Sequence, residues 1–439
     1  MVFTPPTNFA LFKQRRKQLV ESLRNQNKDQ HNIIMLIADF ETDRHIFRQE
    51  SSFYYLTGIT EPAVILCIFP NGREILYIPQ FGTKRSTWTP TMVESLNDAS
   101  KVGVDEIRFL GEKTAGYSYS SVFTKEKYVH LIHDLANALQ THETTQVATL
   151  RDQSHGGLLW HIDLYNHFIA ELPALAHQTI DCSTLIYEMR RIKDDYETDL
   201  IYKAVQITSM AHKTAATLIE PGTHEYEILA AVECVFTQVA AATPAFPSII
   251  ASGQNTTIIH YTQRNRQIKD DDLVVVDIGA EYGMYSADLT RTYPVSKQFT
   301  PRQREIYQKV LDTQLYIESL AKPGMFLKNA RYPEKSLHHL AVTAFERQGL
   351  AQYFCHGLGH YLGLDVHDVG DLQQPLQPGE IFTLEPGVYI PAENIGIRIE
   401  DNYIMADDGI VCLSYELPKH PDEIENMMNL QESNNASPE

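Results

Sequence analysis

A chain of 439 residues is longer than one hydrophobic core usually supports, so we expect two domains. Its content of 43% hydrophobic and 21% charged residues is ordinary for a globular protein in water. A formal net charge of −19 argues against nucleic acid or an anionic membrane as a partner, because both require a basic surface.

The cysteines and the N-terminal segment indicate the compartment. The five cysteines are scattered and form no CxxC pair, so we expect no disulfide framework. The first 20 residues carry cations but no apolar run after them, which is not the pattern of a signal peptide. No run of about 18 or more apolar residues indicates a membrane-spanning helix. We therefore expect a cytoplasmic protein with reduced thiols.

The first part of the chain alternates helical and strand-like patterns. Apolar residues at helical spacing predict helices over 8–24, 124–140 and 160–171. Short apolar runs separated by turn residues predict strands over 33–38, 52–57, 63–69 and 74–78. The pattern is interrupted near 173–184, so we expect an α/β domain over residues 1–178.

The second part begins with helices and becomes rich in strands. Helices are predicted over 187–219 (one or two), 226–240, 301–320, 335–348 and 421–429. We expect a second domain over 179–430, which gives the chain an α/β (α+β) fold class. The polar tail, 431–439, is expected to be disordered.

Five potential metal ligands lie in this second domain, each beside a segment that reads as ordered backbone. They are Asp277, Asp288, His360, Glu385 and Glu400. Four carboxylates and one imidazole form an oxygen-rich set. Such a set suits two adjacent divalent ions of the manganese, cobalt or zinc kind, and it does not suit a thiolate zinc site.

The carboxylates are more informative together than singly, since one aspartate at a strand end is often only a turn cap. Asp277 and Asp288 flank a predicted hairpin with Gly283 in its turn, which can place both carboxylates on one face. Like charges so placed repel each other unless a cation lies between them. Glu385 and Glu400 each follow an apolar strand, where a lone buried carboxylate is costly. The sequence therefore makes the chain a candidate two-metal hydrolase.

Histidines gather around His360 in a glycine-rich segment. His356 and His367 flank it, an arrangement that can supply one ligand and two nearby proton donors or acceptors. His260 ends what reads as another apolar strand. Cys355 beside His356 suggests a Cys–His nucleophile, which we disfavour because adjacent side chains on a strand point to opposite faces. The glycines lack the strand–helix context of a dinucleotide-binding site.

These segments resemble the proline-specific pita-bread metallopeptidases, aminopeptidase P and prolidase. The motifs are HYTQ at 260–263, VVDIGAEYGMYSADLTRTYPV at 275–295, HGLGHYLGLDVHDVG at 356–370, TLEPGVYI at 383–390 and GIRIEDN at 396–402. More weakly, FRQESSFYYLTGITEP at 47–62 resembles the creatinase-like N-terminal domain of that family. The resemblance implies this domain followed by a pita-bread catalytic domain.

The resemblance also implies the ligand arrangement. Asp277 would bind one metal ion, and Asp288 and Glu400 would bridge two. His360 and Glu385 would complete the shell of the other ion, with Mn²⁺ as the expected metal. The ions would lower the pKa of a shared water, and Glu385 would carry its proton towards the leaving nitrogen.

Further residues match positions around the metals. His260 and His367 look like the family's outer histidines, which orient substrate and stabilise the negative oxygen of the intermediate. His356, Tyr389 and Arg398 also match positions near the centre. Arg398 is suited to orienting a carboxylate that binds metal.

The expected function is release of the N-terminal residue from peptides that have proline in the second position. One alternative is prolidase, which cuts only Xaa-Pro dipeptides, because HGLGH at 356–360 suits that branch at least as well. Another is a non-catalytic binding protein on the same scaffold, which predicts the loss of a ligand, whereas all five ligand positions are present. The resemblance further implies a homodimer or homotetramer.

Overall fold

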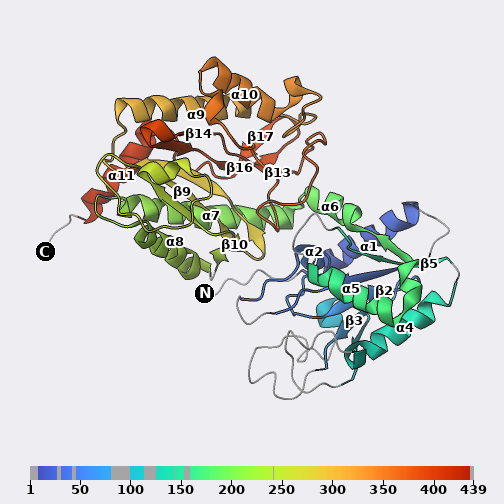
Figure 1. Ribbon diagram of the computed structural model, residues 1–439. Helices are drawn as coiled ribbons and strands as arrows, with labels where there is room; N and C mark the ends of the chain where they lie inside the picture. Colours follow the sequence, from blue (N-terminus) through green and yellow to red (C-terminus); the bar gives the residue numbers. More distant parts are fainter. Residues whose placement is uncertain are drawn as a thin grey trace. The chain divides into compact units, whose positions relative to one another are not determined.

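The computed structural model describes residues 8–26, 31–41, 46–80, 99–112, 125–142, 144–152, 159–240 and 242–435 (Figure 1). They form two compact units, one ending at Met189 and one beginning at Arg190. The division falls inside helix α6 (Ser183–Arg191), later than the domain limit predicted at residue 178.

The first unit is a mixed sheet with helices packed on it. Its strands are β1 (His31–Ile37), β2 (Ile65–Ile68), β3 (Glu74–Ile78), β4 (Glu106–Phe109), β5 (Thr145–Thr149) and β6 (Thr179–Asp181). Its helices before α6 are α1 (Phe9–Gln26), α2 (Ser51–Thr57), α4 (Val129–Leu139) and α5 (Leu159–Glu171). The strand order is β4-β3-β2-β1-β5-β6, in which β1 runs antiparallel to β2 and parallel to β5.

Alternation along β1 gives this sheet two buried faces. Ile33, Met35 and Ile37 belong to a core cluster with Leu135 of α4 and Phe168 of α5. The intervening strand residues are also buried, and α1 contacts β1. A sheet covered on both faces explains why β1 reads as a continuous apolar run.

Residues 52–57 were predicted to be a strand, and this prediction was wrong. They belong to α2, whose residues are all buried. A wholly buried segment has no polar face, so hydrophobic periodicity cannot separate helix from strand. The ends carry the local signals: Glu50 accepts hydrogen bonds from the backbone N–H groups of Ser52 and Phe53, and Gly58 closes the helix at φ 67°.

The second unit places strands between two pairs of helices. Its strands are β7 (Thr243–Pro244), β8 (Ile249–Ser252), β9 (Leu273–Ile278), β10 (Ala280–Tyr282), β11 (Tyr285–Ser286), β12 (Leu289–Pro294), β13 (Ile381–Leu384), β14 (Gly387–Ile390), β15 (Ile395–Arg398), β16 (Asp401–Met405) and β17 (Ile410–Cys412). Its helices are α7 (Asp195–Leu218), α8 (Glu225–Ala240), α9 (Pro301–Leu320), α10 (Leu337–Arg347) and α11 (Pro421–Asn435). Figure 1 shows α7 and α8 along one side of the strands and α9 and α10 along the other.

The predicted hairpin between Asp277 and Asp288 is present and consists of two successive strand pairs. Strands β9 and β12 pair antiparallel, with Asp277 opposite Thr290. The short β10–β11 hairpin extends from their ends and turns at Gly283, whose φ is 59°. A bridge between Thr290 and Glu400 then joins this strand pair to the segment between β15 and β16. Residues far apart in sequence are thereby brought to one place.

Two further expectations differ from the structure. Ile258–His260 do not end a strand; they follow a 3₁₀ helix, Gly253–Thr257, and form a bend and turn. Helix α11 continues to Asn435, so residues 431–435 are helical and not part of a disordered tail. Residues 436–439 lie outside the described residues.

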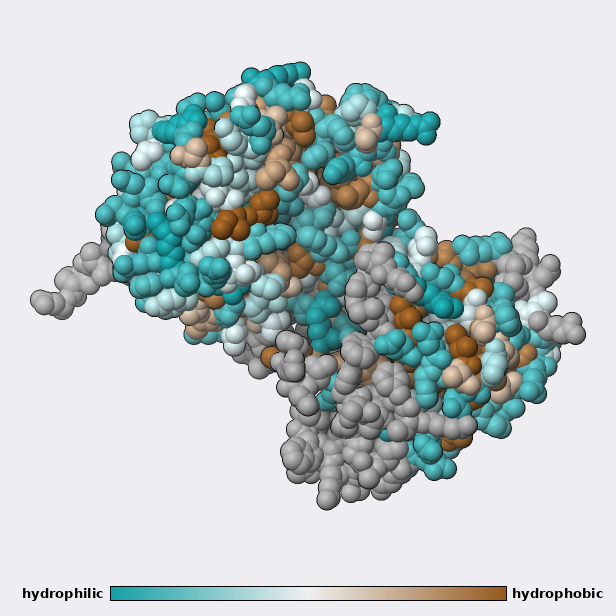
Figure 2. All heavy atoms as spheres, viewed as in Figure 1, coloured by the Kyte–Doolittle hydropathy of each residue, from teal (hydrophilic) through white to brown (hydrophobic). Residues whose placement is uncertain are grey.

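No helix in the described ranges is both long and apolar enough to cross a membrane. The face of the molecule drawn in Figure 2 is mostly hydrophilic, with hydrophobic residues scattered over it.

Candidate metal centre

A cavity of about 700 Å³ opens in the second unit beside strands β8, β9 and β12 to β15. It is lined by every metal-binding or catalytic candidate from the sequence: His260, Asp277, Asp288, His356, His360, His367, Glu385, Arg398 and Glu400. Sequence reasoning assigned no role to the other lining side chains, among them Phe246, Pro247, Ile249, Thr262 and Val366. A single cavity therefore contains all five candidate metal ligands and the candidate catalytic histidines and arginine.

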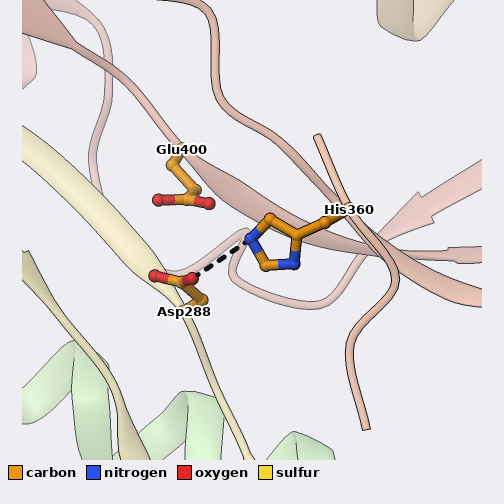
Figure 3. Close-up of side chains that lie close together, drawn as sticks. All are labelled: Asp288, His360 and Glu400. Atoms are coloured by element: carbon orange, nitrogen blue, oxygen red, sulfur yellow. Dashed lines mark ion pairs between the residues drawn. The ribbon is translucent and has the colours of Figure 1, made fainter. Parts of the chain in front are cut away.

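Three of the five candidate ligands form a compact group. One ligand atom from each of Asp288, His360 and Glu400 lies within 4.8 Å of the others. Figure 3 shows these side chains pointing towards one another, with His360 Nε2 at 3.4 Å from Asp288 Oδ2. His360 Nδ1 donates to the carbonyl of Tyr361 at 3.0 Å, which directs Nε2 towards the carboxylates.

Asp288 and Glu400 are held by their backbones. The N–H of Asp288 donates to Asn402 Oδ1 at 3.1 Å, and Asn402 Nδ2 donates back to the Asp288 carbonyl at 2.5 Å. The N–H of Glu400 donates to the Thr290 carbonyl at 3.0 Å. The hydroxyl of Thr290 donates to Glu400 Oε2 at 2.8 Å, so this threonine fixes the carboxylate as well.

Arg398 connects several polar side chains beside the cavity. Its guanidinium donates to Asp277 Oδ2 at 2.5 Å and to the Tyr389 hydroxyl at 2.6 Å. The Tyr389 hydroxyl in turn lies 2.9 Å from His356 Nε2, and His356 Nδ1 donates to the Gly357 carbonyl at 2.7 Å. Since Nδ1 carries the proton, Tyr389 donates to Nε2 of a neutral His356. This chain of hydrogen bonds orients Asp277, Tyr389 and His356 together.

Glu385 is the most exposed of the four carboxylates that line the cavity. Its side chain is 19% exposed, whereas that of Asp288 is 8% exposed. Its two oxygens lie 3.7 Å from His360 Nε2 and 3.7 Å from His356 Nδ1. Its N–H donates to the Leu358 carbonyl at 2.7 Å, which fixes the backbone that carries it.

Burial and mutual repulsion disfavour negative charge in this centre. Burial raises the pKa of Asp288 to about 6 and that of Glu385 to about 7. Burial and the nearby charge of Asp288 raise the pKa of Glu400 well above its ordinary value. Burial opposes charge on His360, but the Asp288 hydrogen bond and the Glu385 charge outweigh it and raise that pKa to about 9. In the absence of metal ions the groups of this centre therefore favour their protonated forms.

Three buried oxygens show that the centre suits divalent cations. Asp277 Oδ1, Asp288 Oδ1 and Glu400 Oε1 accept no hydrogen bond from the described residues. A buried carboxylate oxygen without a partner is costly, and polar groups in protein interiors are normally satisfied. Divalent cations would satisfy all three oxygens and neutralise the carboxylates. The donor set, oxygens with one imidazole, suits such ions.

The outer histidines stand at the cavity surface. His260 and His367 are both exposed, and the His367 ring lies 4.2 Å from the His360 ring, centroid to centroid. Desolvation at the cavity wall, together with nearby positive charge, lowers the pKa of His356 and of His367 to about 4, so both favour the neutral form. Neutral imidazoles can donate or accept a hydrogen bond from substrate.

Cys355 and His356 were expected to lie on a strand, and this prediction was wrong. The two residues follow a 3₁₀ helix, Ala351–Tyr353, in irregular backbone and not in a strand. Cys355 is exposed and is not among the lining side chains of the cavity, whereas His356 is one of them.

This site, a carboxylate-rich cavity in which the His360 imidazole lies against Asp288 and Glu400, is of the kind found in metallohydrolases. Residues 199–407 match metallopeptidase family M24, and residues 12–118 match the aminopeptidase P N-terminal domain. The Xaa-Pro aminopeptidase of Haemophilus influenzae is 32% identical over 430 residues, with 91% of this chain and 94% of the relative covered. The chain therefore belongs to metallopeptidase family M24.

Two more relatives agree with this assignment. The human Xaa-Pro dipeptidase is 26% identical over 485 residues, with 95% of this chain and 93% of the relative covered. The structure of Escherichia coli aminopeptidase P with the inhibitor Pro-Leu matches with a TM-score of 0.81 at 27% identity, and covers 98% of this chain and 100% of that chain. The expected α/β (α+β) class, a creatinase-like domain followed by a pita-bread domain, is confirmed. Family membership makes the chain a hydrolase and implies divalent metal ions.

Glu400→Gln tests whether the charge of the centre requires cations. The raised pKa means that the folded, metal-free protein binds a proton on Glu400 more tightly than the unfolded chain does, and this difference lowers stability as the pH rises from the unfolded pKa towards the folded one. A neutral amide removes that penalty, so with EDTA we expect the Tm of the variant to equal or exceed that of the wild type. Adding Mn²⁺ should raise the Tm of the wild type much more than that of the variant, because binding to the native state stabilises it.

The measurement is a pair of melting curves, with EDTA and with Mn²⁺. Glu393→Gln, which alters a partly exposed ion pair with Arg302, is the matched control and should respond to Mn²⁺ like the wild type. An equal response in Glu400→Gln would contradict its place among the ligands.

Proposed function

We propose that this chain is an Xaa-Pro aminopeptidase, an enzyme with two metal ions that releases the N-terminal residue from peptides with proline in the second position. The observation that carries the proposal is the single cavity that combines five candidate ligands with an apolar wall. Similarity to a relative of that name over most of both chains supports it.

The family resemblance supplies the expected ligand roles: Asp277 would hold one ion, Asp288 and Glu400 would be shared by both, and His360 with Glu385 would hold the other. The orphaned oxygens of Asp277, Asp288 and Glu400 support these three residues as ligands. Hard oxygen donors favour Mn²⁺. Bound divalent cations supply Lewis acidity, which polarises the scissile carbonyl and makes water nucleophilic at neutral pH.

Glu385 is the proton carrier in this proposal. Its oxygens are partly exposed to the cavity, whereas Asp277 is held by Arg398 and Glu400 by Thr290. As water adds to the carbonyl carbon, Glu385 takes its proton. As the C–N bond breaks, the same proton goes to the proline nitrogen, which leaves as a secondary amine.

The outer histidines contact the substrate in this proposal, and Arg398 positions other side chains of the site. His260 and His367 donate towards the carbonyl oxygen as negative charge develops there, the largest contribution expected from groups that are not metal ligands. His356 lies beside Glu385; burial and the Arg398 charge favour its neutral form, and its hydrogen bonds with Tyr389 and Gly357 orient the ring. Arg398 holds Asp277 in place and links it to Tyr389 and His356.

Proline specificity has a physical basis. The Xaa-Pro bond is a tertiary amide without an N–H, so an enzyme that aligns its substrate through that N–H binds it poorly. Binding must then come from contact with the pyrrolidine ring. Phe246, Pro247, Ile249, Ile259 and Val366 give the cavity an apolar wall suited to that ring.

The described lining residues of the cavity offer no available arginine for a substrate carboxylate, and this favours aminopeptidase activity over prolidase activity. An enzyme restricted to dipeptides must recognise the carboxylate that follows proline, a task suited to arginine. Among the described lining residues the one guanidinium is Arg398, and Asp277, Tyr389 and Thr290 already occupy it. Prolidase activity would have to depend on the outer histidines.

A substrate panel tests this function. We expect Xaa-Pro-Yaa peptides to be cut fastest, Xaa-Pro dipeptides more slowly, and matched Xaa-Ala-Yaa peptides far more slowly, because the apolar wall binds the pyrrolidine ring. The measurement is kcat/KM for each member, followed by chromatography of the released residue. Faster cleavage of dipeptides would make the chain a prolidase, and no cleavage by metal-loaded protein would favour the non-catalytic alternative.

Glu385→Gln tests the proton carrier. The amide keeps the size and one ligand oxygen but cannot accept the proton, so kcat should fall by about 10²-fold or more. Metal content, measured by mass spectrometry on the same preparation, separates loss of the proton carrier from loss of an ion. The control Glu393→Gln should retain the wild-type rate. Near-normal turnover by Glu385→Gln with metal bound would remove Glu385 from this role.

Other expectations remain predictions. They are Mn²⁺ as the native ion, a homodimer or homotetramer, a cytoplasmic location, and the lack of nucleic-acid or membrane partners inferred from the net charge of −19.

A further inference from the structure

A cluster of buried charges adjoins His367, and the reaction outlined above does not use it. Asp368 Oδ1 accepts a hydrogen bond from Arg190 Nη2 at 2.5 Å, and Asp368 Oδ2 accepts one from Lys193 Nζ at 3.0 Å. Arg190 Nη2 also lies 2.7 Å from Asp365 Oδ2. We call Arg190, Lys193 and Asp368 the clasp. The side chain of Asp368 is only 1% exposed, so water does not compete for these contacts.

The cationic side of the clasp is itself fixed. Arg190 and Lys193 lie at the end of α6 and in the turn before α7. Between them, Arg191 forms a buried ion pair with Glu380. The backbone N–H of Lys193 donates to the Gly379 carbonyl at 2.9 Å. The two cations are therefore anchored to the segment that leads into β13.

Asp368, the anionic member of the clasp, lies in the loop that carries His367 and fixes that loop in place. The N–H of Asp368 donates to the Tyr361 carbonyl at 3.0 Å. Gly363 packs against the Asp368 carboxylate so closely that a Cβ there would lie 2.1 Å from Oδ2 and 3.0 Å from Lys193 Cε. The Gly363 carbonyl accepts from the N–H of Ser286 at 2.8 Å, which ties the loop to the strand just before Asp288. The clasp thus fixes this loop against the metal-binding hairpin.

His367 depends on this loop for its position. Its ring is exposed to the cavity and makes no hydrogen bond to any residue that the structure describes; its recorded ring contact is with His360 at 4.2 Å. A side chain with no hydrogen bond of its own is placed by its backbone. The residue that follows it, Asp368, is the one that the clasp holds.

We propose that Arg190 and Lys193, acting through Asp368, are positioning residues that hold His367 at the place where it meets the substrate carbonyl. The inference rests on the proposed function of His367. It assigns a functional role to a buried ion cluster that would otherwise count only towards stability.

A double-mutant cycle between Asp368→Asn and His367→Ala tests the inference. The readouts are kcat and KM on an Xaa-Pro-Yaa peptide at saturating Mn²⁺, per mole of folded, metal-loaded enzyme. In the wild-type background Asp368→Asn should lower kcat by about tenfold or more, as expected for a displaced catalytic group. In the His367→Ala background the same change should lower it by less than about twofold, because residues that act as a unit are not additive.

A buried ion pair in the first unit provides the control for stability. Arg16 Nη2 lies 2.7 Å from Glu74 Oε2, and both side chains are almost fully buried. Glu74→Gln should lower the Tm, as removing a partner from a buried pair does, and leave kcat/KM unchanged. If Asp368→Asn does not fold, Lys193→Met removes one cation and keeps the Arg190 contact. It should show the same non-additivity with a smaller fall in kcat.

The outcomes separate the two claims. If His367→Ala alone leaves kcat unchanged, the proposed role of His367 is wrong. If His367→Ala lowers kcat but Asp368→Asn has the same effect in both backgrounds, or none, the clasp is only structural and the inference is overturned.

Discussion

Repulsion among four carboxylates is the constraint on which the second unit depends. Asp277, Asp288, Glu385 and Glu400 all line one cavity, three of them with a buried oxygen that accepts no hydrogen bond from the described residues. Arg398 is the one guanidinium among the described lining residues, and it neutralises only part of this charge. A protein retains such an arrangement where cations complete it, and the raised pKa values of Asp288, Glu385 and Glu400 show how strongly the metal-free centre resists charge.

The surrounding structure keeps these groups together against their repulsion. Paired strands hold Asp277 opposite Thr290, and the Thr290–Glu400 bridge joins that pair to the next sheet. Arg291, on β12, adds a second connection to the same segment: its guanidinium donates to the Glu400 carbonyl at 2.7 Å and to Asp401 Oδ1 at 2.7 Å. Rigid backbone around a strained polar centre gives preorganisation, since ligands cannot relax away from the ions they must bind. The groups proposed to contact substrate, His260 and His367, lie instead on loops.

Sequence reasoning found the centre because each ligand has a local signature. A carboxylate at the end of an apolar strand is visible in one segment, as for Asp277 and Glu385, and the motifs carry the family resemblance. It failed where the deciding contact is not local. The α2 segment is buried on all sides, which removes the periodicity that marks a helix. The Thr290–Glu400 hydrogen bond joins residues 110 positions apart, and the Arg190–Asp368 hydrogen bond joins residues 178 positions apart. No pattern in a single sequence predicts such pairs.

The most direct test of this account is a metal titration of the stripped enzyme. Protein treated with a chelator should hold no divalent ion and should not hydrolyse an Xaa-Pro-Yaa peptide. Calorimetric titration with Mn²⁺ should then show two equivalents bound per chain, with activity restored as they bind and more fully than by other divalent ions. Full hydrolysis by metal-free protein, or the absence of tight binding, would contradict the claim that this carboxylate cluster exists to hold metal ions.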